Sequence, residues 1–194
     1  MKLKWTSNNK LLIKFLVSLF ILGFLIGIYI YIIQPDITKS SIINELSNLG
    51  NTLSNTKQNN FIYHLIIISI FTIFSLFVLG IPVMLFYLFY EGISIGFLIG
   101  GFFHYKKIKG LLYGFIFIII NKLIFYFILI YMLIIALRFS KKLYKVIKNK
   151  DYKIYELVFL QLLKNGFVFI IVIVFDLLIY LFGNKILAYF LFLL

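Results

Sequence analysis

Apolar segments long enough to cross a lipid bilayer are the feature that most constrains how this chain can fold. Hydrophobic residues make up 63% of its 194 positions, whereas charged residues make up only 13%. A transmembrane helix needs about 20 mostly apolar residues to cross about 30 Å of hydrocarbon. Because several such stretches follow one another, the sequence predicts an all-α fold, a polytopic transmembrane helical bundle that forms one integral membrane domain over residues 1–194.

Polar residues interrupt the apolar sequence at positions that predict five membrane-spanning helices. One interruption, the polar loop 34–60, carries Ile42, Leu46, Leu49 and Leu53 at three- and four-residue spacing, which predicts a short amphipathic helix. Another is the basic loop 138–153. The predicted spans are 11–33, 61–79, 83–103, 111–137 and 157–182.

The long apolar stretch 61–103 has one strong break, at Gly80-Ile81-Pro82. A single helix over this stretch would be about 65 Å long, more than twice the thickness of the hydrocarbon core. Proline lacks the amide hydrogen and disfavours helical geometry in the preceding residue. We therefore expect a turn at Gly80 and Pro82 between two spans. A re-entrant break, with both halves partly inside the membrane, is the alternative.

The distribution of basic residues predicts the orientation of the bundle. Five spans place the basic N-terminus and the basic loop 138–153 on one side, and the loop 34–60, whose charges sum to zero, on the other. Cytoplasmic loops carry an excess of Lys and Arg. We therefore expect the N-terminus in the cytoplasm and the C-terminus outside. Three lysines near 106–109 fall on the outer side and disagree with the rule, but the two larger basic segments outweigh them.

Composition and motifs argue against several kinds of chemistry. The chain has no cysteine, and its two histidines, His64 and His104, are expected to be interfacial polar residues rather than metal ligands. Phosphate-binding and nucleophile motifs are absent from the sequence. The net charge is +13, and most of the basic residues flank the apolar blocks, which indicates a role in membrane topology rather than nucleic-acid binding. We expect no catalytic residue, cofactor or metal, and we expect membrane lipids as partners, with the 138–153 run contacting anionic head groups, setting topology, or both.

A glycine stripe on the third predicted span indicates close helix packing. Gly92, Gly96 and Gly100 recur every four residues, and Gly23 and Gly27 repeat the spacing on the first span. Small residues let two membrane helices approach to backbone contact. The pattern leaves open whether the partner helix belongs to the same chain or to another copy in a homo-oligomer. An alternative is that glycine is simply commoner in membrane helices.

Glu91 and Lys122 are the ionisable residues deepest within apolar sequence. Counting 1.5 Å per residue from opposite faces places both side chains at a similar depth, so they are expected to pair. An unpaired charge at the centre of a membrane helix costs at least about 2.5–3.5 kcal/mol. Two interpretations follow: a structural bridge between two spans, which is favoured, or part of an ion or proton relay.

The sequence resembles one family of bacterial integral membrane proteins. Gly80-Ile81-Pro82, the stripe Gly92, Gly96-Phe97 and Gly100, and Lys109-Gly110 are similar to the stage II sporulation protein M family. The order of spans and loops also agrees, and the likeness is tightest over Leu79–Asn121. The resemblance implies a non-enzymatic membrane component that anchors or organises peptidoglycan-degrading enzymes during forespore engulfment.

Two functions from different classes remain after these observations. The resemblance favours a scaffold in the bacterial cytoplasmic membrane, whose partners are other membrane proteins or cell-wall hydrolases recruited through the external loop and the spans. The alternative is a small transporter or permease subunit with Glu91 and Lys122 in a polar path. A membrane-embedded enzyme is disfavoured because the sequence has no cluster of acid and base residues.

Overall fold

The computed structural model describes residues 7–55, 61–149, 154–183, 185–187 and 189, and the secondary-structure elements in these ranges are all helices. The predicted all-α fold is therefore confirmed. In chain order the elements are α1 (Ser7–Ile32), α2 (Asp36–Asn55), α3 (Phe61–Phe74), α4 (Gly80–Ile118), the π-helix η1 (Ile119–Leu123), α5 (Ile124–Lys148), α6 (Ile154–Leu178) and the π-helix η2 (Ile179–Gly183).

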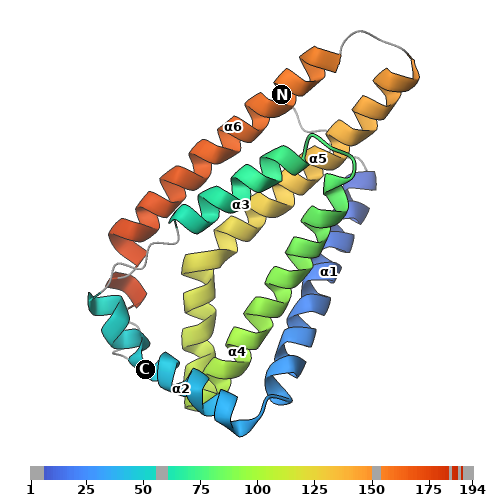
Figure 1. The fold of residues 1–194 in the computed structure, drawn as a ribbon. Helices are drawn as coiled ribbons and strands as arrows, with labels where there is room; N and C mark the ends of the chain where they lie inside the picture. Colours follow the sequence, from blue (N-terminus) through green and yellow to red (C-terminus); the bar gives the residue numbers. More distant parts are fainter. Residues whose placement is uncertain (1–6, 56–60, 150–153, 184, 188, 190–194) are drawn as a thin grey trace.

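Long apolar helices identify the chain as a membrane protein. Lys10–Ile32, Gly80–Lys122 and Ile154–Leu187 are long and apolar enough to cross a bilayer, and a shorter apolar helix covers Ile62–Phe74. Figure 1 shows α1 beside α4, with α3, α5 and α6 forming the other side of the bundle. Helix α2 lies at the lower end of this view.

The element α4 consists of two helical arms joined by a sharp kink. Lys106 (φ −134°, ψ 23°) and Lys107 (φ 51°, ψ −126°) have non-helical backbone angles. The first arm runs down from α3, and the second arm returns toward α5 (Figure 1). The predicted span 83–103 lies on the first arm. The predicted span 111–137 covers the second arm, η1 and the start of α5.

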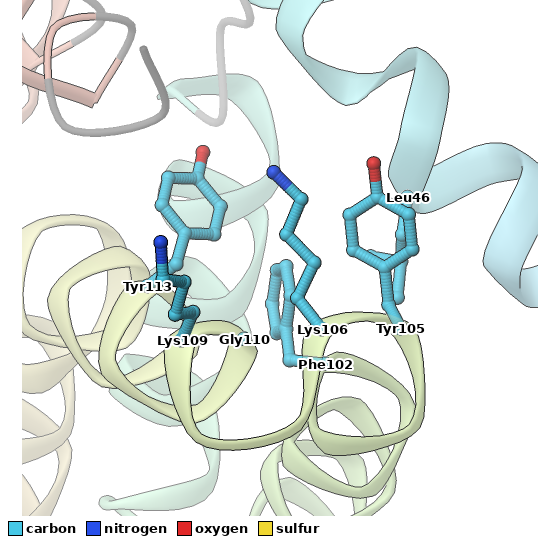
Figure 2. A pocket seen from close by; sticks show the side chains of 7 residues that line it. All are labelled: Leu46, Phe102, Tyr105, Lys106, Lys109, Gly110 and Tyr113. Carbon is cyan, nitrogen blue, oxygen red and sulfur yellow. The ribbon is translucent and has the colours of Figure 1, made fainter. Parts of the chain in front are cut away.

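The two arms of α4 are tightly packed next to the kink. A Cβ atom on Gly110 would collide with the carbonyl oxygen of Phe102, so the arms meet at their backbones. The space left beside them is about 10 Å³, roughly enough for one water molecule. Figure 2 shows its lining: Leu46, Phe102, Tyr105, Lys106, Lys109, Gly110 and Tyr113.

The reversal between α3 and α4 precedes the glycine and proline that were expected to form it. Helix α3 ends at Phe74, and Gly80 and Pro82 lie in the first turn of α4, so the reversal occupies residues 75–79. A Cβ atom on Gly80 would collide with the carbonyl oxygen of Phe74, so glycine allows α4 to begin against the end of α3. With 14 residues, α3 is about 21 Å long and shorter than the hydrocarbon core.

Five helices contribute to the main hydrophobic core. Its fully buried members include Leu16 of α1, Ile68 of α3, Met84 of α4, Met132 of α5 and Val172 of α6. The outer surface of the bundle carries large apolar side chains as well. Because lipid tails are as apolar as these side chains, an apolar outer surface is expected for a helical bundle in a membrane.

The amphipathic helix expected within 34–60 is α2. Its Leu46 is buried against Phe102 in a second, smaller core cluster, and Ile42 packs against the same cluster. The side chains of Leu49 and Leu53 lie outside the described part of the structure. Through Leu46, α2 covers the end of the bundle at which α4 turns (Figure 1).

Candidate functional site

Helices α1 and α4 approach to backbone contact along facing glycines. A Cβ atom on Gly96 would collide with the carbonyl oxygen of Phe24, and one on Gly92 would lie 2.6 Å from that of Phe20. A Cβ atom on Gly23 would lie 3.3 Å from the Cα of Gly92. Close approach of this kind maximises the dispersion contacts on which membrane helices rely. In this structure the helix that faces the stripe is α1 of the same chain.

Gly100, the third residue of the stripe, has a different neighbour. A Cβ atom there would lie 2.9 Å from ring atoms of Tyr31, so the missing side chain makes room for an aromatic ring rather than for a helix backbone. The Tyr31 ring also meets Phe97 edge to face, with centroids 5.4 Å apart. Gly100 thereby fixes the position of Tyr31 at the lower end of the α1–α4 contact.

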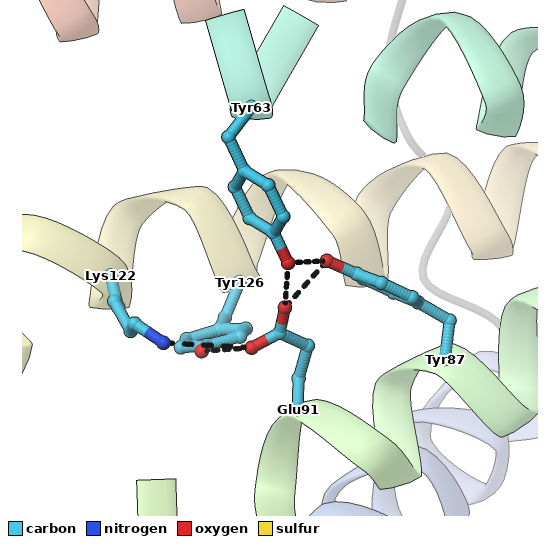
Figure 3. Close-up of polar contacts among 5 residues, drawn as sticks. All are labelled: Tyr63, Tyr87, Glu91, Lys122 and Tyr126. Carbon is cyan, nitrogen blue, oxygen red and sulfur yellow. Dashed lines mark hydrogen bonds and ion pairs between the residues drawn. The ribbon is translucent and has the colours of Figure 1, made fainter. Parts of the chain in front are cut away.

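Glu91 is the centre of a buried polar cluster. Tyr63 of α3 and Tyr87 of α4 both donate hydrogen bonds to its Oε1, the first at 2.8 Å. Tyr126 of α5 donates to Oε2, also at 2.8 Å. Figure 3 shows these hydroxyls converging on the carboxylate, together with the amine of Lys122. We call these five residues the Glu91 centre.

Lys122 approaches the carboxylate from the edge of the cluster. Its Nζ lies 3.9 Å from Glu91 Oε2, and its side chain is 25% exposed, whereas that of Glu91 is 4% exposed. The residue lies in η1, where the wider π-helical turn interrupts the path from α4 to α5. The structure therefore brings together the two residues that the sequence pairs. The contact is a long ion pair, and the close hydrogen bonds come from the tyrosines.

The Glu91 centre can hold a negative charge without any ligand. Its three hydroxyl donors and one cation satisfy both carboxylate oxygens, which offsets the cost of removing the charge from water. The donors come from α3, α4 and α5, so the same bonds tie three helices together. Among the described residues, no group of three or more His, Cys, Asp or Glu side chains is placed to hold a metal ion.

A second buried pair, His64 and Asp176, was not anticipated. The Nδ1 of His64 lies 2.7 Å from Oδ1 of Asp176, and both side chains are 4% exposed. The His64 ring also stacks on Phe125, with centroids 4.0 Å apart. The expectation that His64 is an interfacial residue is wrong, because α6 supplies a buried carboxylate partner for it. His104 is exposed, as an interfacial residue would be.

Helix α6 is attached to the reversal between α3 and α4 by a further buried hydrogen bond. Asn165 donates from Nδ2 to Oγ of Ser75, the first residue after α3, at 2.8 Å. In contrast, Oδ2 of Asp176 has no hydrogen-bond partner in the described part of the structure. The contact with His64 therefore leaves one oxygen of Asp176 able to accept a hydrogen bond from another donor.

Comparison with known proteins gives a match to a protein family. The family model described as "Stage II sporulation protein M" matches residues 16–183. This region contains the Glu91 centre, the His64–Asp176 pair and the facing glycines of α1 and α4. No curated protein and no solved structure matches the chain.

Proposed function

Because the chain belongs to the stage II sporulation protein M family, a family of sporulation-related membrane proteins, we propose that it is a non-enzymatic membrane scaffold. In this proposal it anchors or organises peptidoglycan-remodelling enzymes in the cytoplasmic membrane during forespore engulfment. The family match over residues 16–183 is the observation that carries the proposal.

The buried polar groups support a structural rather than a catalytic role. Each carboxylate oxygen of Glu91 already accepts a hydrogen bond from a side chain of the bundle, and the facing glycines bring α1 and α4 to backbone contact. Both features favour a rigid bundle. A scaffold also needs surface to offer to partners. We propose that α2 faces outward, where its Ile37, which is 85% exposed, is available to contact another protein.

Transport is a second candidate, and Asp176 is the observation that favours it. A proton relay needs more than one titratable group within the membrane. Tyr63 and His64 are adjacent in α3 and contact Glu91 and Asp176 respectively, and Asp176 retains a free oxygen within the described structure. These groups could form a polar path along α3.

Replacing Glu91 with glutamine distinguishes the two functions. The amide oxygen of Glu91→Gln still accepts hydrogen bonds from tyrosine hydroxyls, but the side chain cannot ionise. In a sporulating strain that lacks the native gene, the scaffold proposal expects this variant to restore engulfment. It also expects the tagged variant to co-purify peptidoglycan-degrading activity, detected on a zymogram, at the level of the unmodified protein.

Two results would contradict the scaffold. One is a deletion strain that completes engulfment normally, with no hydrolase activity enriched on the tagged protein. The other is a Glu91→Gln protein that accumulates to normal levels and binds its partners but restores nothing. That second result would indicate a titrating carboxylate and support transport.

A further inference from the structure

A cavity of about 590 Å³ lies between the end of α1 and the kinked region of α4, apart from the Glu91 centre. Its walls are apolar and comprise Ile28, Ile32, Ile99, Phe103 and Leu111. Ile32 is 61% and Phe103 50% exposed, so the cavity opens on the outer surface of the bundle, where lipid is present. Its volume falls within the range of about 300–1,000 Å³ that is typical of small-molecule sites.

Basic side chains from separate segments gather at this cavity. They are Lys39 of α2, and His104 and Lys107 at the kink of α4, and no carboxylate is among the lining residues. Lys39 is only 18% exposed, and its contact with Asp36, whose side chain is fully exposed, is 3.9 Å long. A long contact to a fully exposed carboxylate contributes little. The cavity therefore combines apolar walls with two lysines whose charge no lining residue neutralises.

Tyr31 forms part of the cavity wall through its ring. The residue is only 3% exposed, and its hydroxyl is buried away from the open cavity with no hydrogen-bond partner within the described structure. The Tyr31 ring is fixed against Gly100, and the hydroxyl cannot simply turn away to water.

The backbone at Lys107 is a further unusual feature of the same cavity. Lys107 is the one described non-glycine residue with a positive φ, 51°, which is a strained conformation for a lysine. Strained residues of this kind are concentrated at ligand clamps and functional turns. The kink turns Lys107 toward a cavity that already contains Lys39 and His104.

We infer that this cavity binds an anionic glycerophospholipid. An acyl chain occupies the apolar walls, and the phosphate head group is held by Lys39 and Lys107. Basic pockets between membrane helices are a recognised form of lipid head-group site. The bound lipid would also bridge α2 to the kink of α4, because Lys39 belongs to α2 and Lys107 to the kink.

The test is lipid binding by the purified full-length chain, measured by native mass spectrometry and by the thermal unfolding midpoint in detergent. The probes are phosphatidylglycerol, diacylglycerol with the same acyl chains, and inorganic phosphate. Phosphatidylglycerol should remain bound and raise the midpoint, whereas diacylglycerol should bind roughly tenfold more weakly and phosphate should have no effect. Equal binding of the two lipids, or a full effect of phosphate alone, would overturn the inference.

Variants at the lining residues make the test specific. Lys39→Gln and Lys107→Gln should each weaken phosphatidylglycerol binding about tenfold, whereas Tyr31→Phe should bind as the unmodified chain does, because its hydroxyl does not reach the cavity. The matched control is Lys142→Gln, an exposed basic residue of α5 outside the cavity, which should bind as the unmodified chain does. Without lipid, Tyr31→Phe should unfold at the same or a higher temperature, because it removes an unpaired buried hydroxyl. Normal binding by both lysine variants, or an equal loss in the control, would exclude this site.

Discussion

Tyr63 and His64 are consecutive residues of α3, yet their side chains bond to carboxylates on different helices. Tyr63 donates to Glu91 of α4, and His64 pairs with Asp176 of α6. Successive residues of an α-helix point about 100° apart, which is why one helix can reach two neighbours in this way. Helix α3 is too short to cross the bilayer by itself, but it joins the two sides of the bundle through these bonds.

The first prediction concerns the His64–Asp176 pair. Replacing either partner alone leaves the other buried without its hydrogen bond, so His64→Leu and Asp176→Leu should each destabilise the protein. For His64→Leu the loss should be about 3 kcal/mol or more when Asp176 stays charged. The double variant should recover much of this loss, because a buried pair is replaced by apolar side chains. Unfolding midpoints in detergent measure the effect.

The control for these charge changes is Asp36→Asn in α2. The Asp36 side chain is fully exposed, so this change should leave the unfolding midpoint unchanged. If the single changes at His64 and Asp176 behave like this control, the pair does not hold α3 to α6. If the double variant is less stable than both single variants, the pair is not replaceable by apolar packing.

The second prediction ranks the members of the Glu91 centre. Glu91→Leu removes the acceptor of three hydroxyls and should destabilise the protein by about 3–5 kcal/mol. Lys122→Leu should cost clearly less, because its amine is partly exposed and 3.9 Å from the carboxylate. Tyr126→Phe, which removes one hydroxyl donor, should cost about 1.5–3 kcal/mol. A Lys122→Leu variant as unstable as Glu91→Leu would mean that the ion pair, and not the tyrosines, holds the charge.

Much of the architecture follows from sequence patterns that depend on one segment at a time. Apolar length predicts the helices, and the glycine spacing predicts a close contact, because both are local features. The sequence contains no equally local signal for Tyr63, Tyr87 and Tyr126 as donors to Glu91, since each tyrosine resembles the other aromatic residues of an aromatic-rich chain.

Contacts between distant segments explain what sequence reasoning missed. His64 and Asp176 are 112 positions apart, and only the packing of α3 against α6 makes them partners. The reversal before α4 is displaced from Gly80 and Pro82 to residues 75–79 for a related reason. Proline is compatible with the first turn of a helix, and glycine there permits the close contact with the end of α3.

The third prediction concerns the glycines. Gly96→Ala places a methyl group against the carbonyl oxygen of Phe24 and should destabilise the bundle by about 1–3 kcal/mol, and Gly96→Leu should do so more strongly. Gly166 of α6 is a matched control, because a Cβ atom there would meet nothing within 4 Å. Gly166→Ala should leave stability unchanged or raise it by up to about 1 kcal/mol, since alanine is the better helix former. Equal effects at Gly96 and Gly166 would show that α1 and α4 do not meet at their backbones.

The fourth prediction concerns orientation in the membrane. Figure 1 places the start of α1, the α3–α4 reversal and the end of α5 at one end of the bundle, and α2 with the kink of α4 at the other. Ser47 of α2 and Lys145 of α5 are exposed residues at these opposite ends. From the positive-inside rule we predict that the end with the basic part of α5 is cytoplasmic. In intact cells, an impermeant thiol reagent should therefore label Ser47→Cys and not Lys145→Cys, and the absence of cysteine from the native chain keeps the background low.

After the cells are opened, both variants should be labelled, which controls for accessibility of the thiol. Labelling of Lys145→Cys alone in intact cells would invert the bundle and place α2, and the cavity that it borders, on the cytoplasmic side.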